Sequence, residues 1–541
     1  MNLQWQTFNE LILDCANKYG EKNAFSLYHD EKWQTLSFVA LNEQSQLRAT
    51  ALLQSGHQPG DRIALLAGTS IEWIAQFLAI VRIGCIVVPL DPKATEEELE
   101  IILTHVEPKS LVAAKELQGF AFQAQQKLKI KKILLLEVLY ETEQKLDFPP
   151  TDKKQTAAIY YTSGTSGAPK GVMLSMESLL SELDTLLAYQ ESVPTSVVFS
   201  ILPLHHLYGL VAGALYSFAC GAEFVFAHRL SPVDIRFCLE ERKVTHLFVV
   251  PLLLQIMHRS IQEKIQARSP KEKFIFQTLF KISALFPYSI RRKIFSKIHE
   301  QIGGRLEGIV SGGAPLDPKT YHFFCRIGLP IYEGYGLTET GPVISVNTPR
   351  HHKVGTVGRA IPCAEVKVIA NGEESEGEIC TRGPHVMQGY FKNPELSREV
   401  LSEDGWFHTG DLGRIENGYL RIIGRKKSLI VLHSGKKIYA EEVEKILSSS
   451  ELFQEICVLG IPELDRGEQV VAVIYPNTKI LLQEFEKQKL LIEAEVQNAT
   501  QVLAQFKRPI RTILLQEPMP KTANGKIRRN HLREKIIREQ M

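Results

Sequence analysis

Short apolar runs alternate with longer amphipathic stretches through the first 350 residues, and this alternation restricts the fold more than any other feature of the sequence. Residues 62–66 and 85–89 have the character of buried strands, and a helix is expected between them at residues 71–83. Strands separated by helices form parallel sheets, because the crossover between them needs a dozen or more residues. The sequence therefore predicts an α/β fold with largely parallel sheets. Further strands are expected at residues 157–161, 199–202, 223–227, 246–250 and 308–310.

The pattern of predicted secondary structure changes near residue 351. Glycine-punctuated short strands at 355–369, 376–383 and 418–423 predict a small antiparallel β unit. A compact α/β segment with a basic tail follows Gly424. A chain of 541 residues is too long for one hydrophobic core, so we place a domain boundary near residues 424–428.

Composition excludes several classes of protein. The formal net charge of +2 argues against nucleic acid as the main partner. The eight cysteines are scattered singly without a CxxC pair, which excludes a zinc knuckle and a disulfide scaffold and suits a reducing compartment. The N-terminal residues do not read as a signal peptide, and no apolar run reaches the roughly 18 residues of a membrane span. We therefore expect a cytoplasmic protein.

Residues 160–174, YYTSGTSGAPKGVML, have the composition of a phosphate-binding loop. Glycines let backbone N–H groups turn toward an anion, the hydroxyl side chains add donors, and Lys170 adds a charge. The loop is not a Walker A motif, because Gly164 and Gly167 are too close together and Pro169 removes an N–H before the lysine. A glycine-rich surface loop is the alternative, but the apolar run before it favours a strand that leads into a phosphate site.

Six further motifs follow in order: LPLHHLYGL at 202–210, VSGGAPL at 310–316, YEGYGLTET at 332–340, WFHTGD at 406–411, GYLRIIGRKK at 418–427 and PKTANGKIRR at 520–529. With these motifs the chain resembles the adenylate-forming superfamily of acyl-CoA synthetases, luciferases and nonribosomal adenylation domains, from about residue 20 to residue 530. The resemblance implies an N-terminal domain of residues 1–424, with two α/β sheet subdomains and a small β subdomain. It also implies a small mobile α+β C-terminal domain of residues 425–541.

The resemblance implies a reaction in which a carboxylate attacks the α-phosphorus of ATP, releases pyrophosphate and leaves an acyl-adenylate. The glycine-rich loop would grip the β and γ phosphates. Tyr335 would pack on adenine, Thr338 would contact the α-phosphate, and Glu339 with Thr162 would hold Mg²⁺, which prefers oxygen ligands. The implied ATP-binding residues are Thr162, Ser163, Gly164, Thr165, Ser166, Gly167, Lys170, Gly313, Ala314, Glu333, Gly334, Tyr335, Gly336, Thr338, Asp411 and Arg425.

Three residues have implied catalytic roles. Lys526 would bridge the carboxylate and α-phosphate oxygens and stabilise an anionic transition state. Lys427 matches the position about which the C-terminal domain swings between two poses, and His206 lines the acyl pocket and gates access of a thiol. The implied substrate-binding residues are His206, Ser311, Gly312 and Gly336. In this interpretation Gly312 and Gly313 let the substrate approach the backbone.

The histidine pair and two departures from the family pattern restrict these assignments. Adjacent histidines on a strand or turn usually point apart, so His205 and His206 are expected to be a structural pair and not ligands of one ion. Ala440 stands where relatives usually have proline, and Val431 stands where luciferases carry a lysine, so that lysine's role does not carry over.

The segment 259–316 resembles that of long-chain fatty acyl-CoA synthetases. The leading hypothesis is a long-chain fatty acid:CoA ligase that uses ATP, Mg²⁺ and CoA. The alternatives are transfer to the phosphopantetheine of acyl carrier protein, a fatty acyl-AMP ligase, and a non-catalytic nucleotide- or lipid-binding regulator. Luciferase chemistry is not excluded by the motifs. The acyl chain length of the substrate and the oligomeric state of the protein stay open.

Residues 261–305 carry ten lysines and arginines against three glutamates, a local excess that stands out in a nearly neutral chain. Ile290, Ile294 and Ile298 would share one helical face, with Arg291, Arg292, Lys293 and Lys297 over the rest. Such a helix can lie on an anionic bilayer, which would place the protein peripherally at the inner membrane face. The alternative is a helix with its apolar face in the core.

Overall fold

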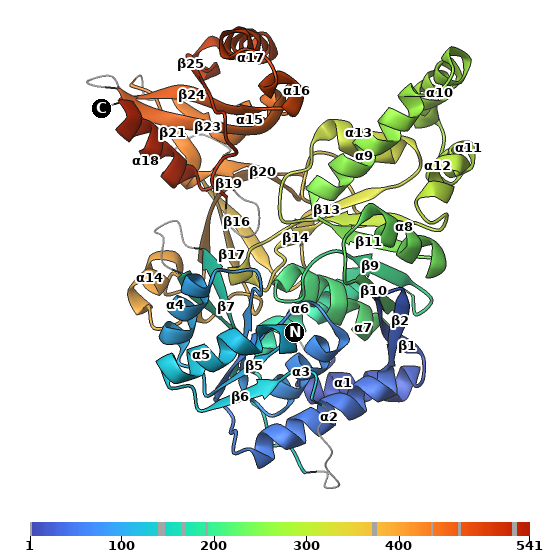
Figure 1. Ribbon diagram of the computed structural model, residues 1–541, viewed down its shortest axis with the longest axis vertical. Coiled ribbons are helices and arrows are strands. Elements are labelled where there is room, and N and C mark those ends of the chain that lie inside the picture. The colour runs from blue at the N-terminus through green and yellow to red at the C-terminus, as the bar shows by residue number, and fades with distance from the viewer. Residues whose placement is uncertain are drawn as a thin grey trace. The chain divides into compact units, whose positions relative to one another are not determined.

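The computed structural model describes residues 3–138, 146–163, 169–189, 193–370, 376–433, 436–463, 467–521 and 527–540. The chain forms two compact units (Figure 1). Unit 1 comprises residues 1–366 and 381–407, and unit 2 comprises residues 367–380 and 408–541. The fold class is therefore confirmed: a mixed α/β protein with a large N-terminal part and a small C-terminal part. The predicted boundary at residue 424 stays a prediction, because compactness does not show where a domain moves.

Two large sheets form the framework of unit 1. In the order of their pairing, the first contains β18 (Gly389–Tyr390), β8 (Pro169–Ser175), β7 (Thr156–Ser163), β4 (Ile86–Leu90), β3 (Arg62–Leu66), β5 (Ser110–Ala113) and β6 (Lys132–Leu135). The second contains β15 (Arg359–Ala360), β14 (Ser345–Val346), β13 (Ile331–Tyr335), β12 (Gly308–Ser311), β11 (His246–Val249), β9 (Val197–Ser200), β10 (Glu223–Ala227), β1 (Asn23–His29) and β2 (Lys32–Ser37).

Helices connect these strands, as the alternation in the sequence predicts. They are α1 (Phe8–Tyr19), α2 (Phe38–Gln54), α3 (Ile71–Arg82), α4 (Glu96–Val106), α5 (Gln118–Leu128), α6 (Met176–Tyr189), α7 (Tyr216–Cys220), α8 (Pro232–Glu241), α9 (Pro251–Gln266), α10 (Pro270–Ile282), α11 (Tyr288–Ile294), α12 (Ser296–Gln301), α13 (Pro318–Arg326) and α14 (Pro394–Val400). No helix in the described part of the chain is both long enough and apolar enough to span a membrane.

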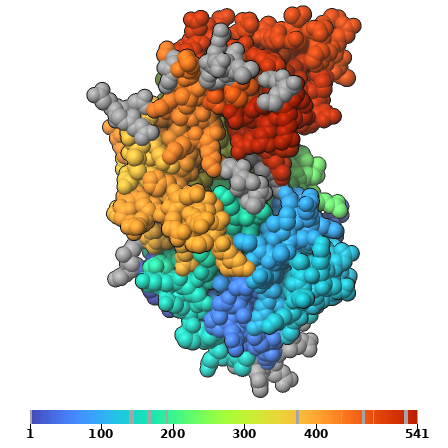
Figure 2. Space-filling model, turned by 90° about the vertical axis from the view of Figure 1, so that its left-hand side faces the viewer, coloured from blue at the N-terminus to red at the C-terminus, as the bar shows by residue number. Residues whose placement is uncertain are grey.

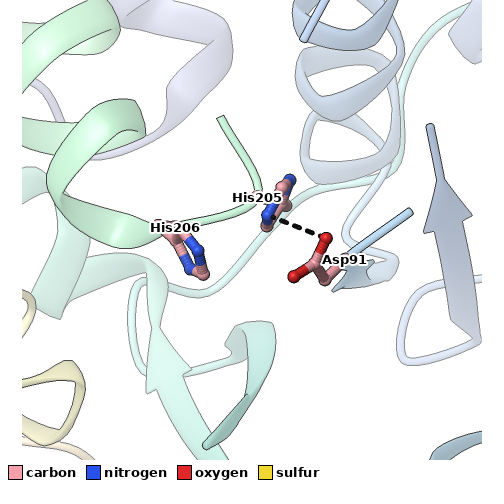
Figure 3. A group of neighbouring side chains, drawn as sticks. All are labelled: Asp91, His205 and His206. Atoms are coloured by element: carbon pink, nitrogen blue, oxygen red, sulfur yellow. Dashed lines mark ion pairs between the residues drawn. The ribbon is translucent and has the colours of Figure 1, made fainter. Parts of the chain in front are cut away.

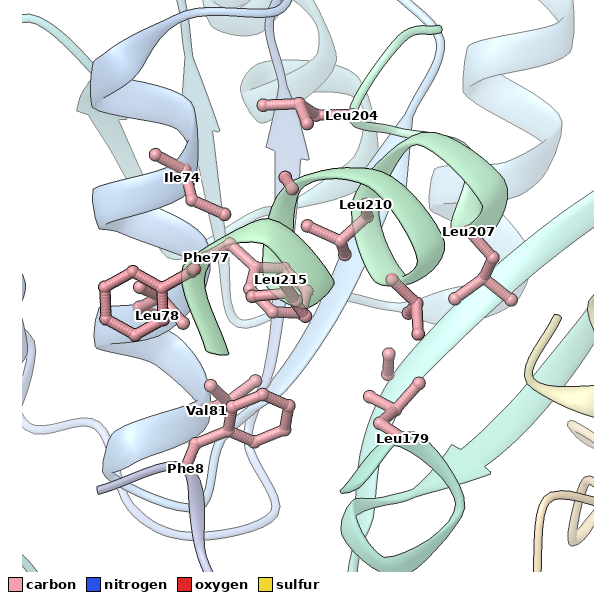
Figure 4. Close-up of a cluster of buried hydrophobic side chains, with 14 of the residues drawn as sticks. Phe8, Ile74, Phe77, Leu78, Val81, Leu179, Leu204, Leu207, Leu210 and Leu215 are labelled. Carbon is pink, nitrogen blue, oxygen red and sulfur yellow. The ribbon is translucent and has the colours of Figure 1, made fainter. Parts of the chain in front are cut away.

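Helix α3 shows how the sequence sets this framework. The Ser70 side chain caps the helix by accepting a hydrogen bond from the backbone N–H of Trp73, and Glu72 stands in the first turn, where the helix dipole favours an acid. The residues from Trp73 to Arg82 are all buried. Figure 4 shows Phe77, Leu78 and Val81 of this helix beside Phe8 of α1 and the segment 204–215.

Segments far apart in the sequence meet on one face of unit 1. Lys392 forms an ion pair of 2.9 Å with Glu107 and donates a hydrogen bond to the carbonyl of His105, at the end of α4. Figure 2 shows this face, where the orange surface of the chain near residue 390 meets the blue surface of α4. The segment that carries β18 is thereby fixed to the body of unit 1.

The glycine-rich loop joins two paired strands. β7 and β8 are antiparallel, with Thr162 opposite Lys170 and Ser163 opposite Pro169. A Walker A loop instead leads from a strand into a helix, so this topology supports its exclusion. Residues 164–168, which include Gly164, Thr165, Ser166 and Gly167, lie outside the described residues.

The described residues of unit 2 form three small sheets. One consists of β16 (Glu365–Ala370), β17 (Gly377–Arg382), β19 (Phe407–Glu416) and β20 (Tyr419–Arg425). The others consist of β21 (Leu429–Val431) with β22 (Lys437–Tyr439), and of β23 (Phe453–Glu463), β24 (Gly467–Pro476) and β25 (Arg511–Leu514). The helices are α15 (Ala440–Leu447), α16 (Thr478–Leu481), α17 (Phe485–Thr500) and α18 (Arg529–Gln540).

The predicted single helix over residues 290–298 is wrong. The chain turns at Phe295 between α11 and α12, and this side chain is buried in the core beside β11 and β12. Ile294 and Ile298 pack against the same core, whereas Ile290 is exposed. The helix is therefore interrupted at Phe295, where this side chain is buried, and residues 290–298 do not form one continuous amphipathic face.

Candidate active site

The predicted substrate and nucleotide residues of unit 1 meet at the carboxyl ends of parallel strands. β12 and β13 pair in parallel, with Ser311 opposite Glu333. The SGGA and EGYG segments therefore leave the sheet side by side, at the edge where ligands bind in open α/β sheets. This arrangement brings Ser311, Gly312, Gly313, Ala314, Glu333, Gly334, Tyr335 and Gly336 into one region of unit 1.

The structure shows why a glycine stands at position 312, which the sequence alone does not reveal. A Cβ placed there would stand 3.2 Å from the ring of Tyr208, so the ring already occupies the space beside this backbone. The Tyr208 hydroxyl lies 3.2 Å from the carbonyl oxygen of Val310 and 3.3 Å from that of Val249, near the ends of β12 and β11. At Gly312 the close neighbour is therefore the ring of Tyr208, and the approach of a substrate to this backbone stays a prediction. At Gly313 the backbone has a φ of +80°, which favours glycine.

A tight hairpin follows β13. The backbone N–H of Ile344 donates to the carbonyl of Tyr335 over 2.8 Å. A Cβ on Gly336 would stand 1.9 Å from the carbonyl oxygen of Pro342, so only glycine fits at this position. Thr338 and Glu339 stand in a short 3₁₀ turn within the hairpin.

A tyrosine from β18 orients the predicted magnesium ligand. The Tyr390 hydroxyl donates a hydrogen bond of 2.9 Å to Glu339 Oε1, and the backbone N–H of Met387 donates to the Glu339 carbonyl over 2.9 Å. Burial and the Glu339 carboxylate raise the pKa of Tyr390, so its proton stays in place. Lys170 Nζ lies 5.5 Å from the centre of the same ring. The carboxylate of Glu339 and the hydroxyl of Thr162 are oxygen donors of the kind that Mg²⁺ takes, so the residues present fit this ion.

A buried glutamate lies behind the same hairpin. Glu182 of α6 is fully buried and accepts a hydrogen bond of 3.1 Å from the backbone N–H of Val343. Burial raises the pKa of Glu182 well above its ordinary value, which keeps its carboxyl protonated. This residue fixes the turn that lies against Gly336.

The two histidines do not point apart, contrary to the expectation from their adjacency. Their ring centres lie 4.4 Å apart, and Asp91 Oδ1 at the end of β4 lies 3.6 Å from His205 Nε2 (Figure 3). The pair stands in a turn, in which the backbone N–H of His206 donates a hydrogen bond to the carbonyl of Pro203. Burial, and then the neighbouring His206, lower the pKa of His205 to about 3, so this ring is uncharged.

The remaining predicted residues belong to unit 2. Asp411 and Arg425 are opposite each other on β19 and β20, and Arg425 Nε lies 2.9 Å from Asp411 Oδ1. Asp411 is buried and Arg425 is half exposed, so the pair presents one side to solvent. Lys427 stands in a short 3₁₀ turn after β20. Lys526 lies outside the described residues, between Lys521 and Ile527, which pair across an antiparallel bridge.

Four residues of this region are absent from the sequence-based assignment: Asp91, Glu182, Tyr208 and Tyr390. Tyr390 stands within GPHVMQGYFKNPE at 383–395, a stretch for which the sequence predicted no site residue. Tyr208 stands within the quoted motif LPLHHLYGL but was given no role. Asp91 and Glu182 carry no local signal, since Asp91 lies beside His205 and Glu182 contacts Val343, 161 residues along the chain.

Comparison with known proteins found relatives along most of the chain. Long chain acyl-CoA synthetase 1 of Arabidopsis thaliana is 31% identical, over 87% of this chain and 79% of the relative. Two further Arabidopsis relatives are the long-chain-fatty-acid--[acyl-carrier-protein] ligase AEE15, 29% identical over 88% and 77%, and an oxalate--CoA ligase, 30% identical over 97% of both chains.

Among solved structures, ATP-bound MatB from Rhodopseudomonas palustris superposes with a TM-score of 0.79 at 26% identity, over 98% of this chain and 100% of MatB. The sequence profile of the AMP-binding enzymes matches residues 13–391, and that of the AMP-binding enzyme C-terminal domain matches residues 442–526. This chain belongs to the AMP-binding enzyme family.

Proposed function

We propose that the chain activates a carboxylic acid with ATP and transfers the acyl group to the thiol of CoA. In the first step a carboxylate oxygen bonds to the α-phosphorus, the bond to the bridging oxygen breaks, and pyrophosphate leaves. In the second step the thiol sulfur bonds to the acyl carbon, its proton passes to solvent, and AMP leaves. The observation that carries the proposal is the pairing of β12 with β13, which sets the SGGA and EGYG segments side by side. Glu339, whose carboxylate is oriented by Tyr390, stands in the turn that follows EGYG.

Each residue then has one task in the first step. The segment from Thr162 to Lys170 binds the β and γ phosphates, Tyr335 packs on adenine, and Thr338 contacts the α-phosphate. Mg²⁺, held by Glu339 and Thr162, neutralises phosphate charge when it is bound. Asp411 accepts hydrogen bonds from the ribose hydroxyls, and Arg425, paired with it over 2.9 Å, orients that carboxylate.

Two lysines and one histidine connect the first step with the second. Lys526 places a cation between the carboxylate and the α-phosphate, which repel each other. The C-terminal domain then turns about Lys427, because Lys526 must leave before a thiol can enter. His206 lines the acyl pocket on the thiol side.

We propose a long-chain fatty acid as the substrate. The segment between β11 and β12 is almost wholly helical, with α9, α10, α11 and α12, and it corresponds to the segment whose sequence resembles long-chain synthetases. The names of the relatives leave two points to experiment, since one acts on oxalate and another transfers to acyl carrier protein.

Pyrophosphate release measured with palmitate, octanoate and oxalate tests the substrate. Release that is fastest with palmitate supports the long-chain assignment, and release with oxalate alone contradicts it. The same assay with CoA or holo-acyl carrier protein as the added thiol identifies the acceptor. Acyl-AMP that accumulates with neither thiol consumed would identify a fatty acyl-AMP ligase, and ATP binding without pyrophosphate release would identify a non-catalytic regulator.

We further propose that α10 and the turn after it contact an anionic bilayer, from which a long-chain acid would be collected. Phe274, Ile275 and Leu285 are 70%, 56% and 82% exposed, although they are large apolar side chains. Lys271 and Lys281 are exposed on the same helix. A bilayer offers both an apolar interior and a negative surface, and each cation near that surface contributes about 1 kcal/mol.

The basic residues that serve this contact differ from those expected from the sequence. Arg291 donates hydrogen bonds to the carbonyl oxygens of Phe286, Cys325 and Ala284, and so holds α11 in place. The side chain of Arg292 is partly withdrawn from solvent, and this burial lowers the pKa of its guanidinium. Reversing Arg291 would therefore disturb the fold and not only the surface.

Lys271, Lys281 and Lys293, all exposed, are the better choice for charge reversal to glutamate. The triple variant should lose co-sedimentation with anionic vesicles, and the parent should be released as salt rises. The matched control reverses Lys32, Lys131 and Lys489, which are exposed elsewhere on the chain. Equal sedimentation of both triple variants, or no binding of the parent at low salt, would leave α10 as an ordinary surface helix.

A further inference from the structure

Asp91, His205 and His206 form the group of potential metal ligands that the described residues bring together in unit 1. One nitrogen of each histidine and one carboxylate oxygen all lie within 4.8 Å of one another. Figure 3 shows Asp91 arriving from the end of β4 and both rings from the turn at 203–206, with the three side chains around a common space. No role in the proposed reaction has been given to Asp91 or to His205.

The shortest separation in the cluster suits a small cation with nitrogen and oxygen ligands. In a tetrahedral zinc site with bonds of roughly 2.0–2.1 Å, neighbouring ligand atoms stand about 3.4 Å apart. The separation of 3.6 Å between Asp91 Oδ1 and His205 Nε2 is close to this value. His206 is half-buried, and one of its ring nitrogens lies within 4.8 Å of the other two ligand atoms.

An ordinary polar contact accounts poorly for the closest pair. The distance of 3.6 Å between Asp91 Oδ1 and His205 Nε2 is too long for a hydrogen bond. His205 Nδ1 is buried and has no hydrogen-bond partner among the described residues, so nothing on that side fixes the tautomer. Nε2 can therefore present its lone pair toward Asp91, where a cation between the two would satisfy both.

We infer that Asp91, His205 and His206 bind a divalent transition-metal ion of the zinc class. Two imidazoles with one carboxylate select zinc-like ions over Mg²⁺ or Ca²⁺, which take oxygen ligands. The carboxylate offsets part of the charge of the ion, and a water molecule would take the fourth position. The side chain of Asp91 is 19% exposed, so the ion has access from solvent.

A consequence for activity rests on the proposed function. An ion bound here would coordinate the imidazole of His206, which lines the proposed acyl pocket. Zn²⁺ should therefore inhibit pyrophosphate release in the presence of excess Mg²⁺. A chelator should restore the parental rate. Asp91→Asn should keep that rate but need at least about tenfold more Zn²⁺ for inhibition, as expected when a zinc site is impaired.

The decisive experiment is calorimetric titration of the full chain with ZnCl₂, and with MgCl₂ for comparison. The parent should bind one Zn²⁺ that Asp91→Asn and His206→Ala each weaken at least tenfold. Because the chain has 16 histidines, the matched control is His322→Ala, an exposed histidine outside the cluster, which should bind as the parent does. Thermal unfolding of each variant without metal verifies that it is folded.

Co²⁺ supplies a second, spectroscopic measurement of the same site. Co²⁺ bound to the parent should give the visible absorption of a four-coordinate ion, and His206→Ala should lose it. Failure of the parent to bind Zn²⁺, or equal binding by the parent and His206→Ala, would overturn the inference. A chain that releases no pyrophosphate with any acid would contradict the proposed function and leave the titration unaffected.

Discussion

Gly336→Ala tests whether the hairpin after β13 is the wall of the active site. A Cβ at this position would stand 1.9 Å from the carbonyl oxygen of Pro342, 2.7 Å from its carbonyl carbon and 2.8 Å from Val343 Cα. All three are backbone atoms, so no side chain can rotate away. The closest contact must open to at least 3.0 Å, which requires a backbone movement of more than 1 Å.

This movement acts on groups that the proposed reaction needs. The turn at Pro342 is held by the hydrogen bonds from Val343 N–H to Glu182 and from Ile344 N–H to the Tyr335 carbonyl. Overpacking of a tight site costs about 1–3 kcal/mol of the free energy of unfolding. A displacement of 1 Å near reacting groups can cost about 100-fold in rate.

We therefore expect Gly336→Ala to fold with lower thermal stability and to release pyrophosphate about 100-fold more slowly than the parent. The matched control is Gly119→Ala in α5, where a Cβ meets nothing within 4 Å. Alanine is the better helix former by roughly 0.8–1.0 kcal/mol, so the control should be at least as stable as the parent and fully active. Parental pyrophosphate release by Gly336→Ala would refute the assignment of this hairpin to the active site.

Four further changes probe single contacts. Tyr390→Phe removes the hydroxyl that donates to Glu339 and should raise the Mg²⁺ concentration needed for half-maximal pyrophosphate release by at least tenfold, since a hydrogen bond to a charged group contributes about 1.5–3 kcal/mol. Lys526→Ala should slow adenylation by about 100-fold or more while thioester formation from supplied acyl-AMP survives. Lys427→Pro should leave adenylation and stop thioester formation, as expected at a hinge. Because burial raises the pKa of Glu182 above its ordinary 4.5, the parent should lose stability as pH rises above that value, and Glu182→Gln should flatten this dependence in thermal unfolding from pH 5 to 9.

Much of the framework follows from local pattern. The strand predicted at 62–66 is β3, and the helix predicted at 71–83 is α3, because a capping serine, an acid in the first turn and a continuous apolar stretch agree there. The strand predicted at 85–89 is displaced by one residue in β4. The helix predicted over 290–298 is wrong because periodicity cannot show that Phe295 is buried at a turn.

The candidate site likewise contains residues that could be predicted from local sequence patterns and residues that could not. The glycines and hydroxyls that would contact ATP stand in short motifs, because a phosphate or a purine is bound by a few consecutive backbone and side-chain groups. The residues that position those motifs come from other elements: Tyr390 is 51 residues from Glu339, and Glu182 is 161 residues from Val343. No local pattern links such pairs, since each position alone is an ordinary buried tyrosine or an unexplained glutamate in a helix. The motifs therefore predict the proposed reaction. The positions of the residues that would perform it depend on long-range contacts, which exist only once the two large sheets have formed.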